Sequence, residues 1–130
     1  MNSERGALAL VGSGEYLIQM QEIESDLLQR AISKGKSNTY IQIPTGAGLE
    51  SADRIEFWKE RGAAQAKRIG AQCRFLPILS REDAFNEEYI SEISNAGLIY
   101  FSGGDPGYIT EVFNQTPLWE KIRSEFNSGT

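Results

Sequence analysis

Short apolar runs alternate along this chain with stretches in which apolar side chains recur every three or four residues. The short runs predict strands at residues 7–11, 40–43, 73–79 and 98–101. The recurring pattern predicts helices at residues 20–31, 55–69, 85–96, 106–113 and 117–126. Strands and helices that alternate in this way predict a doubly wound parallel α/β sheet with three layers, built as one domain over residues 1–130.

The stretch around which the chain is organised covers residues 96–108, where an apolar run stops at two glycines, an aspartate and a proline. Gly103 and Gly104 predict a tight turn. Asp105 can cap the next helix, and Pro106 suits its first position. Free N–H groups at the carboxyl end of a parallel strand can bind a ligand or stabilise an oxyanion. An ordinary connection between a strand and a helix explains the same residues.

Two other loops are expected near the glycine turn, at the carboxyl ends of the parallel strands. Gly12 and Gly14 begin a dinucleotide fingerprint, but Leu17 stands where its third glycine belongs, which disfavours a Rossmann site. The loop at residues 44–48 follows the second strand. Glu15, Tyr16 and Thr45 lie on these two loops, and the sequence assigns no role to them.

Pro77 lies inside the third apolar run and predicts that this strand ends early or lies near an edge of the sheet. Cys73, in the same run, has no glycine elbow around it and is expected to act as a small buried apolar residue. It is the only cysteine, so no disulfide within the chain is expected.

Charge and composition narrow the possible partners and chemistry. Eighteen acidic and thirteen basic residues give a net charge of −5 without a basic cluster, so neither nucleic acid nor a membrane is an expected partner. No leader or long apolar span is seen, and a cytoplasmic protein is expected. The chain contains no histidine, which excludes a Ser-His or Cys-His pair and a His-ligated metal within it. No cofactor or metal is expected.

The end of the pattern is unusual, because an alternating fold calls for another strand after Gly129. The expected sheet is therefore open at one edge, and three explanations remain. The chain is a fragment truncated at its C-terminus, it forms a homodimer through the open edge, or the order of its strands shields that edge.

Residues 7–15, 43–45, 96–106 and 116–119 resemble the N-terminal portion of the peptidase S51 family. This family contains enzymes of the dipeptidase E and cyanophycinase type. The resemblance runs through essentially the whole chain, and its most specific element is the Gly-Gly-Asp turn. It implies a class I glutamine amidotransferase-like fold, which belongs to the same three-layer α/β/α class as the flavodoxin-like fold.

The resemblance also implies a serine hydrolase that acts on peptide or isopeptide bonds. In the family, the nucleophilic serine lies on a Gly-x-Ser-x-Gly elbow after the next strand, and a histidine follows later. By motif match, Gly104 contributes an oxyanion-hole amide, Gly103 shapes the turn and Asp105 holds it. The elbow is not found in this chain: Ser128 does not stand in that motif, and Ser102 precedes the glycines without any possible histidine partner.

We therefore expect an incomplete domain of the S51 type that is inactive alone. It is a truncated gene product, a partial piece of a longer chain, or one part of a split enzyme. When completed, it is expected to act on a small peptide or peptide-like substrate. One alternative is a non-catalytic domain that binds a small anion or a peptide, or serves assembly, through the same glycine turn. Another is a folded α/β remnant without activity.

Overall fold

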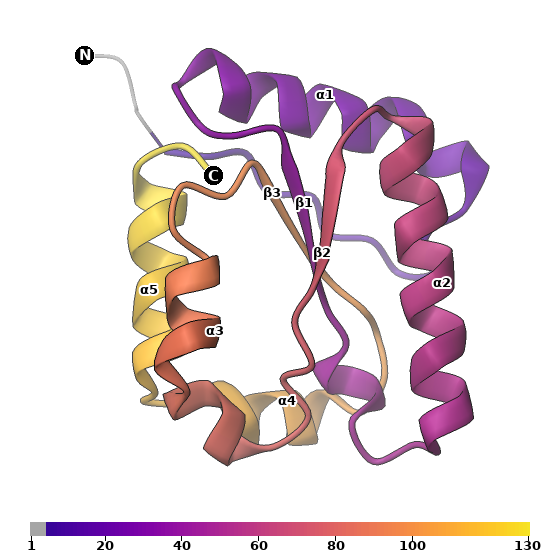
Figure 1. The fold of residues 1–130 in the computed structure, drawn as a ribbon, viewed down its shortest axis with the longest axis vertical. Coiled ribbons are helices and arrows are strands. Elements are labelled where there is room, and N and C mark those ends of the chain that lie inside the picture. The colour runs from indigo at the N-terminus through magenta and orange to yellow at the C-terminus, as the bar shows by residue number, and fades with distance from the viewer. Residues whose placement is uncertain (1–4) are drawn as a thin grey trace.

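Three parallel strands form the centre of the computed structural model, which describes residues 5–130 (Figure 1). They are β1 (Thr39–Ile43), β2 (Gln72–Phe75) and β3 (Leu98–Phe101), in the order β2-β1-β3. Tyr40 of β1 is opposite Cys73 of β2 on one side and Leu98 of β3 on the other. Parallel neighbours on both sides of β1 confirm the predicted α/β class.

Helices cover both faces of this sheet, which confirms the doubly wound arrangement. The helices are α1 (Gln21–Ser33), α2 (Ala52–Arg68), α3 (Glu87–Glu92), α4 (Pro106–Phe113) and α5 (Pro117–Asn127). In Figure 1, α2 lies to the right of the strands, and α3 and α5 lie to the left. Short 3-10 turns occupy residues Ile18–Met20, Thr45–Ala47 and Arg81–Phe85.

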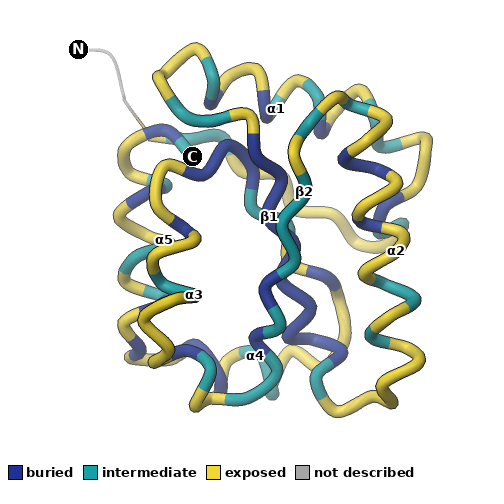
Figure 2. Tube along the Cα trace, viewed as in Figure 1, coloured by how far each residue is buried: buried dark blue, intermediate teal, exposed yellow. Residues whose placement is uncertain are grey.

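The two faces of β1 carry the two parts of the core. Ile41 and Ile43 pack into a cluster with side chains of α4 and α5, while Tyr40 packs with Leu28 of α1 and Ala66 of α2. All residues of β1 are buried, as the dark blue trace in Figure 2 shows. This strand carries apolar side chains on both faces because helices cover both of them.

The predicted first strand at residues 7–11 is wrong. The structure leaves this segment outside the sheet, and the side chains of Leu8 and Leu10 are 72% and 89% exposed. The Gly6 amide donates to the Phe126 carbonyl at 2.7 Å, so the segment starts against the end of α5. An apolar run becomes a buried strand only when a ladder partner and covering elements are present, and the described residues supply neither here.

Two helix predictions also need correction. The helix predicted at residues 85–96 is shorter, because Asn86 caps α3 with its side chain and Phe85 remains in the preceding turn, 51% exposed. The three- and four-residue spacing of apolar side chains in residues 20–31 predicts Ile23 on the buried face of α1, but Ile23 is exposed and Glu24 is buried. Glu24 is tolerated there because it accepts hydrogen bonds from the Tyr40 hydroxyl and from Gln65 Nε2.

Both outer strands lie at edges of the sheet. β2 ends at Phe75, before Pro77, as the sequence predicts. The strand before the glycine turn, β3, is the other edge strand, and Phe101 at its end is 39% exposed. Cys73 of β2 is half-buried, and burial raises the pKa of its thiol. Among the described residues, no helix is both long and apolar enough to span a membrane.

Candidate functional site

The turn that follows β3 is fixed by contacts on both of its sides. The Ser102 amide donates to the Ile43 carbonyl, and the Asp105 amide donates to the Gly46 carbonyl, each at 3.1 Å. The Asp105 carboxylate accepts from the Tyr108 amide at 3.1 Å and so caps α4, as the sequence predicts. Gly104 has a φ of 151°, and a Cβ on it would overlap the Gly46 carbonyl oxygen. Only glycine fits this position.

Two backbone donors of this turn have no acceptor within residues 5–130. Among the described residues, hydrogen bonds engage the amides of Ser102 and Asp105, but none engages the amide of Gly103 or Gly104. Both glycines are exposed and lie at the carboxyl end of a parallel strand, just before the N-terminus of α4. Such donors can bind a carboxylate or the oxyanion that develops in acyl transfer.

The loop after β1 supports the turn from its other side. The Thr45 hydroxyl donates to the Ile78 carbonyl at 2.6 Å and is buried. This bond ties the 3-10 turn Thr45–Ala47 to the segment after β2, and Gly46 packs directly against the backbone of Gly103 and Gly104. The loops that follow β1 and β3 therefore meet at the carboxyl ends of these strands, as expected, and Thr45 has a supporting role there.

Tyr16 reaches the same turn from the N-terminal loop. Its hydroxyl is hydrogen-bonded to Ser102 Oγ at 2.6 Å, and its ring lies 4.4 Å from the ring of Tyr100. Tyr16 is buried with a φ of 62°, and burial raises the pKa of its phenol. It is therefore protonated near neutral pH and cannot serve as a base for Ser102.

The structure thus brings together, around a single turn, residues that are far apart in the sequence. Gly103, Gly104 and Asp105 form the turn itself, and the Glu15 carboxylate lies over Gly103, where a Cβ would contact it. Sequence reasoning left Tyr16 without a role because its partner Ser102 is 86 positions away and no local pattern reveals such a pair. Within the described part of the chain, no group of His, Cys, Asp and Glu side chains could hold a metal ion.

Of three comparisons with known proteins, the comparison with solved structures finds a match. No protein family model matches the chain. No curated protein matches it either. Among solved structures, the crystal structure of a peptidase from an acI-B1 Actinobacterium matches with a TM-score of 0.93 and 51% sequence identity. The match covers 96% of this chain and 51% of that one, so the chain spans about half the length of the peptidase. Over that half, this chain has the fold of a peptidase and a closely similar sequence.

Proposed function

We propose that this chain forms the oxyanion-stabilising part of a serine peptidase of the S51 type, and that its nucleophile and base come from residues outside the chain. The observation that carries the proposal is the pair of amides at Gly103 and Gly104, which have no acceptor within residues 5–130. The similarity to a peptidase supports the reaction class. The S51 assignment rests on the Gly-Gly-Asp turn and the segments around it.

In this proposal the turn acts on charge that develops during acyl transfer. When a nucleophile attacks the carbonyl of a peptide or isopeptide bond, the carbonyl oxygen becomes an oxyanion that accepts from the Gly104 amide, with Gly103 beside it. The contacts of Asp105 with Gly46 and Tyr108 hold these donors in place before the substrate arrives. Preorganised donors need no rearrangement during the reaction, which is why they lower its barrier.

The described residues do not supply the covalent step. The chain has no histidine, and the raised pKa values of Tyr16 and Cys73 keep both groups protonated near neutral pH. Ser102 is buried against Tyr16 and is not positioned as an exposed nucleophile. We therefore expect the purified chain to show no peptide hydrolysis above a blank reaction.

The first test is to sequence the encoding gene past the codon for Thr130 and to measure the intact mass of the protein from its native source. The proposal expects a polypeptide, continuous or separate, that carries a Gly-x-Ser-x-Gly elbow and a later histidine. With that part present, small peptides should be cleaved, and replacing the elbow serine by alanine should lower kcat by at least about a thousandfold. Hydrolysis by the purified chain alone, or full activity after the serine replacement, would contradict the proposal.

The unengaged amides also support a second candidate function, the binding of a small anion or a peptide carboxylate without catalysis. The two candidates differ in what they require. A binding domain should bind acetate or an acetylated peptide with a free carboxylate saturably, with shifts of the Gly103 and Gly104 amide resonances, and should need no second part. A complementing part that restores hydrolysis would favour the peptidase.

A further inference from the structure

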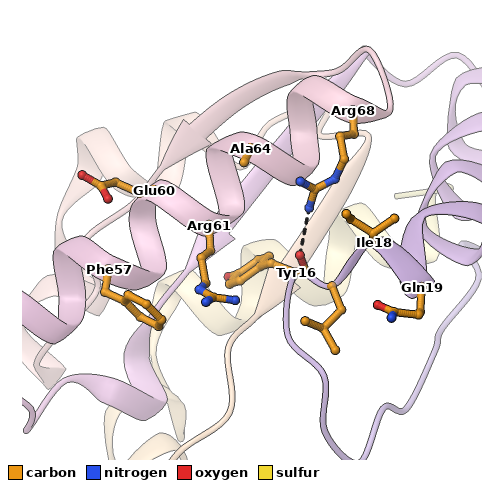
Figure 3. Close-up of a pocket in the computed structure, with 9 residues that line it drawn as sticks. Tyr16, Ile18, Gln19, Phe57, Glu60, Arg61, Ala64 and Arg68 are labelled. Carbon is orange, nitrogen blue, oxygen red and sulfur yellow. Dashed lines mark hydrogen bonds between the residues drawn. The ribbon is translucent and has the colours of Figure 1, made fainter.

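A cavity of about 570 Å³ lies between α2 and the loop that contains Tyr16. Its helical wall is made by Phe57, Arg61, Ala64 and Arg68, and its other wall by residues 16–19 (Figure 3). We call these residues the arginine pocket. It contains none of the residues of the Ser102–Asp105 turn, and Tyr16 is the residue that it shares with the candidate site.

The spacing of residues along α2 explains why the surface is hollow here. Positions 57, 61, 64 and 68 lie three or four residues apart and therefore share one side of the helix. Ala64 has the shortest side chain of the four and stands between the two arginines, which leaves space between them. Leu17 and Ile18 of the opposite loop give the space an apolar wall.

Arg68 fixes one side of the pocket. Its Nε donates to Gln65 Oε1 at 2.8 Å, and one terminal nitrogen donates to the Tyr16 carbonyl at 3.0 Å, which Figure 3 marks with a dashed line. These bonds hold the Arg68 guanidinium beside the loop that contains Tyr16. Its other N–H groups have no acceptor among residues 5–130.

Arg61 has even fewer partners. Its guanidinium lies 4.4 Å from the centre of the Phe57 ring, and no hydrogen bond or ion pair engages it within the described chain. Arg54 lies over the same ring at 4.6 Å, so two cations share one aromatic ring. Glu60 is the acidic residue of the pocket, and in Figure 3 its carboxylate points away from the guanidinium groups of Arg61 and Arg68. Arg61 and Arg68 thus form a local concentration of positive charge in a chain of net charge −5, and neither has an ion-pair partner among the described residues.

We infer that the arginine pocket binds a carboxylate on a small molecule of about dipeptide size. A guanidinium offers parallel N–H donors that match the two oxygens of a carboxylate, and such charge-assisted bonds are among the stronger polar contacts. The volume lies within the range of pockets that hold small ligands. Leu17, Ile18 and Phe57 favour a short apolar group next to the carboxylate.

The test uses the isotope-labelled chain in two-dimensional NMR titrations with acetyl-alanyl-alanine, with its C-terminal amide as the uncharged match. We expect saturable shifts of the amides of residues 16–19, 61 and 68 with the free acid, and binding at least about tenfold weaker with the amide. A parallel titration with succinate distinguishes a free dicarboxylate from a peptide end as the source of the carboxylate. Equal binding of acid and amide, or no saturable shift with either carboxylate, would overturn the inference.

Three variants distinguish specific binding in the arginine pocket from nonspecific electrostatic attraction to the chain. Arg61→Gln should weaken binding of the acid at least about tenfold. Lys59→Gln, which removes a cation from another part of the same helix, should leave it unchanged. Ala64→Leu fills the space between the arginines and should also abolish binding. Since residues 59, 61 and 64 are exposed, all three variants are expected to fold, which their NMR spectra will check. Wild-type affinity in Arg61→Gln, or an equal loss in Lys59→Gln, would contradict the site.

Discussion

Gly104 is the residue whose backbone most narrowly limits substitution in the candidate site. We predict that Gly104→Ala lowers the free energy of unfolding by about 2 kcal/mol or more, because its φ is 151° and a Cβ would overlap the Gly46 carbonyl. Gly12→Ala is the matched control, since nothing lies near its Cβ, and should change stability by less than about 0.5 kcal/mol. Urea unfolding of both variants measures the difference. Equal stability of the two would show that the turn is not constrained as described.

The hydrogen bond between Tyr16 and Ser102 is a second constraint on the candidate site. A buried hydroxyl needs a partner, and each of these two supplies one to the other at 2.6 Å. Tyr16 adopts a left-handed conformation that is uncommon for an aromatic residue, and Arg68 holds its carbonyl. The same residue thus packs against the candidate oxyanion turn and forms a wall of the arginine pocket.

At the scale of elements, Glu125 attaches α5 to the rest of the fold. It pairs with Lys36 at 2.6 Å and Lys121 at 3.0 Å, and accepts from the Asn95 amide. Burial alone raises its pKa, but the two lysines and the amide outweigh burial and lower the pKa below its usual 4.5. A lowered folded-state pKa gives stability that is present above pH 4.5 and lost as the pH falls through the folded value.

We therefore predict that Glu125→Gln is less stable than the wild type at pH 7, by about 2 kcal/mol, because Lys36 loses its carboxylate partner. The difference should shrink as the pH falls below 4.5, where the wild-type carboxylate itself becomes protonated. Denaturant unfolding from pH 7 to pH 3 measures it. Glu120→Gln, which removes an exposed carboxylate on the same helix, is the control and should show little effect. A pH-independent difference would refute this account of α5.

Elements with a local signal could be predicted from the sequence, and those that depend on distant partners could not. Asp105 and Thr116 cap helices that begin at a proline, and Pro77 limits β2, because these effects act within a few residues. Residues 7–11 carry the apolar signal of a strand, but ladder formation needs a neighbour that no local pattern guarantees. Glu24 looks like a solvated residue until Tyr40 and Gln65 are brought to it. The local pattern predicts Gly103, Gly104 and Asp105 as candidate site residues, whereas the buried support by Tyr16 follows only from the fold.

For the whole molecule, the outer side of β3 is one of the two open edges of the described sheet. Among the described residues β3 pairs with β1 alone, so the polar backbone groups of its other side have no ladder partner. Leu8 and Phe101 line a cavity of about 410 Å³ beside this edge, together with Phe113 and Trp119. Leu10, on the same N-terminal segment as Leu8, is 89% exposed. An unpaired strand next to exposed apolar side chains favours pairing with another polypeptide.

We predict that this edge pairs with a second copy of the chain when no other partner is present. The weight-average mass in sedimentation equilibrium should rise from one chain toward two as the concentration increases, because association buries Leu8, Leu10 and the β3 edge. The net charge of −5 opposes this only weakly, since salt screens repulsion between surfaces. Leu8→Lys with Leu10→Lys should shift the equilibrium toward single chains by at least about tenfold, because each lysine places a charge in the apolar contact. Leu49→Lys is the control, since Leu49 is 71% exposed but lies on the loop before α2. A mass of one chain at every concentration, or the same shift in the control, would rule out self-association through this edge.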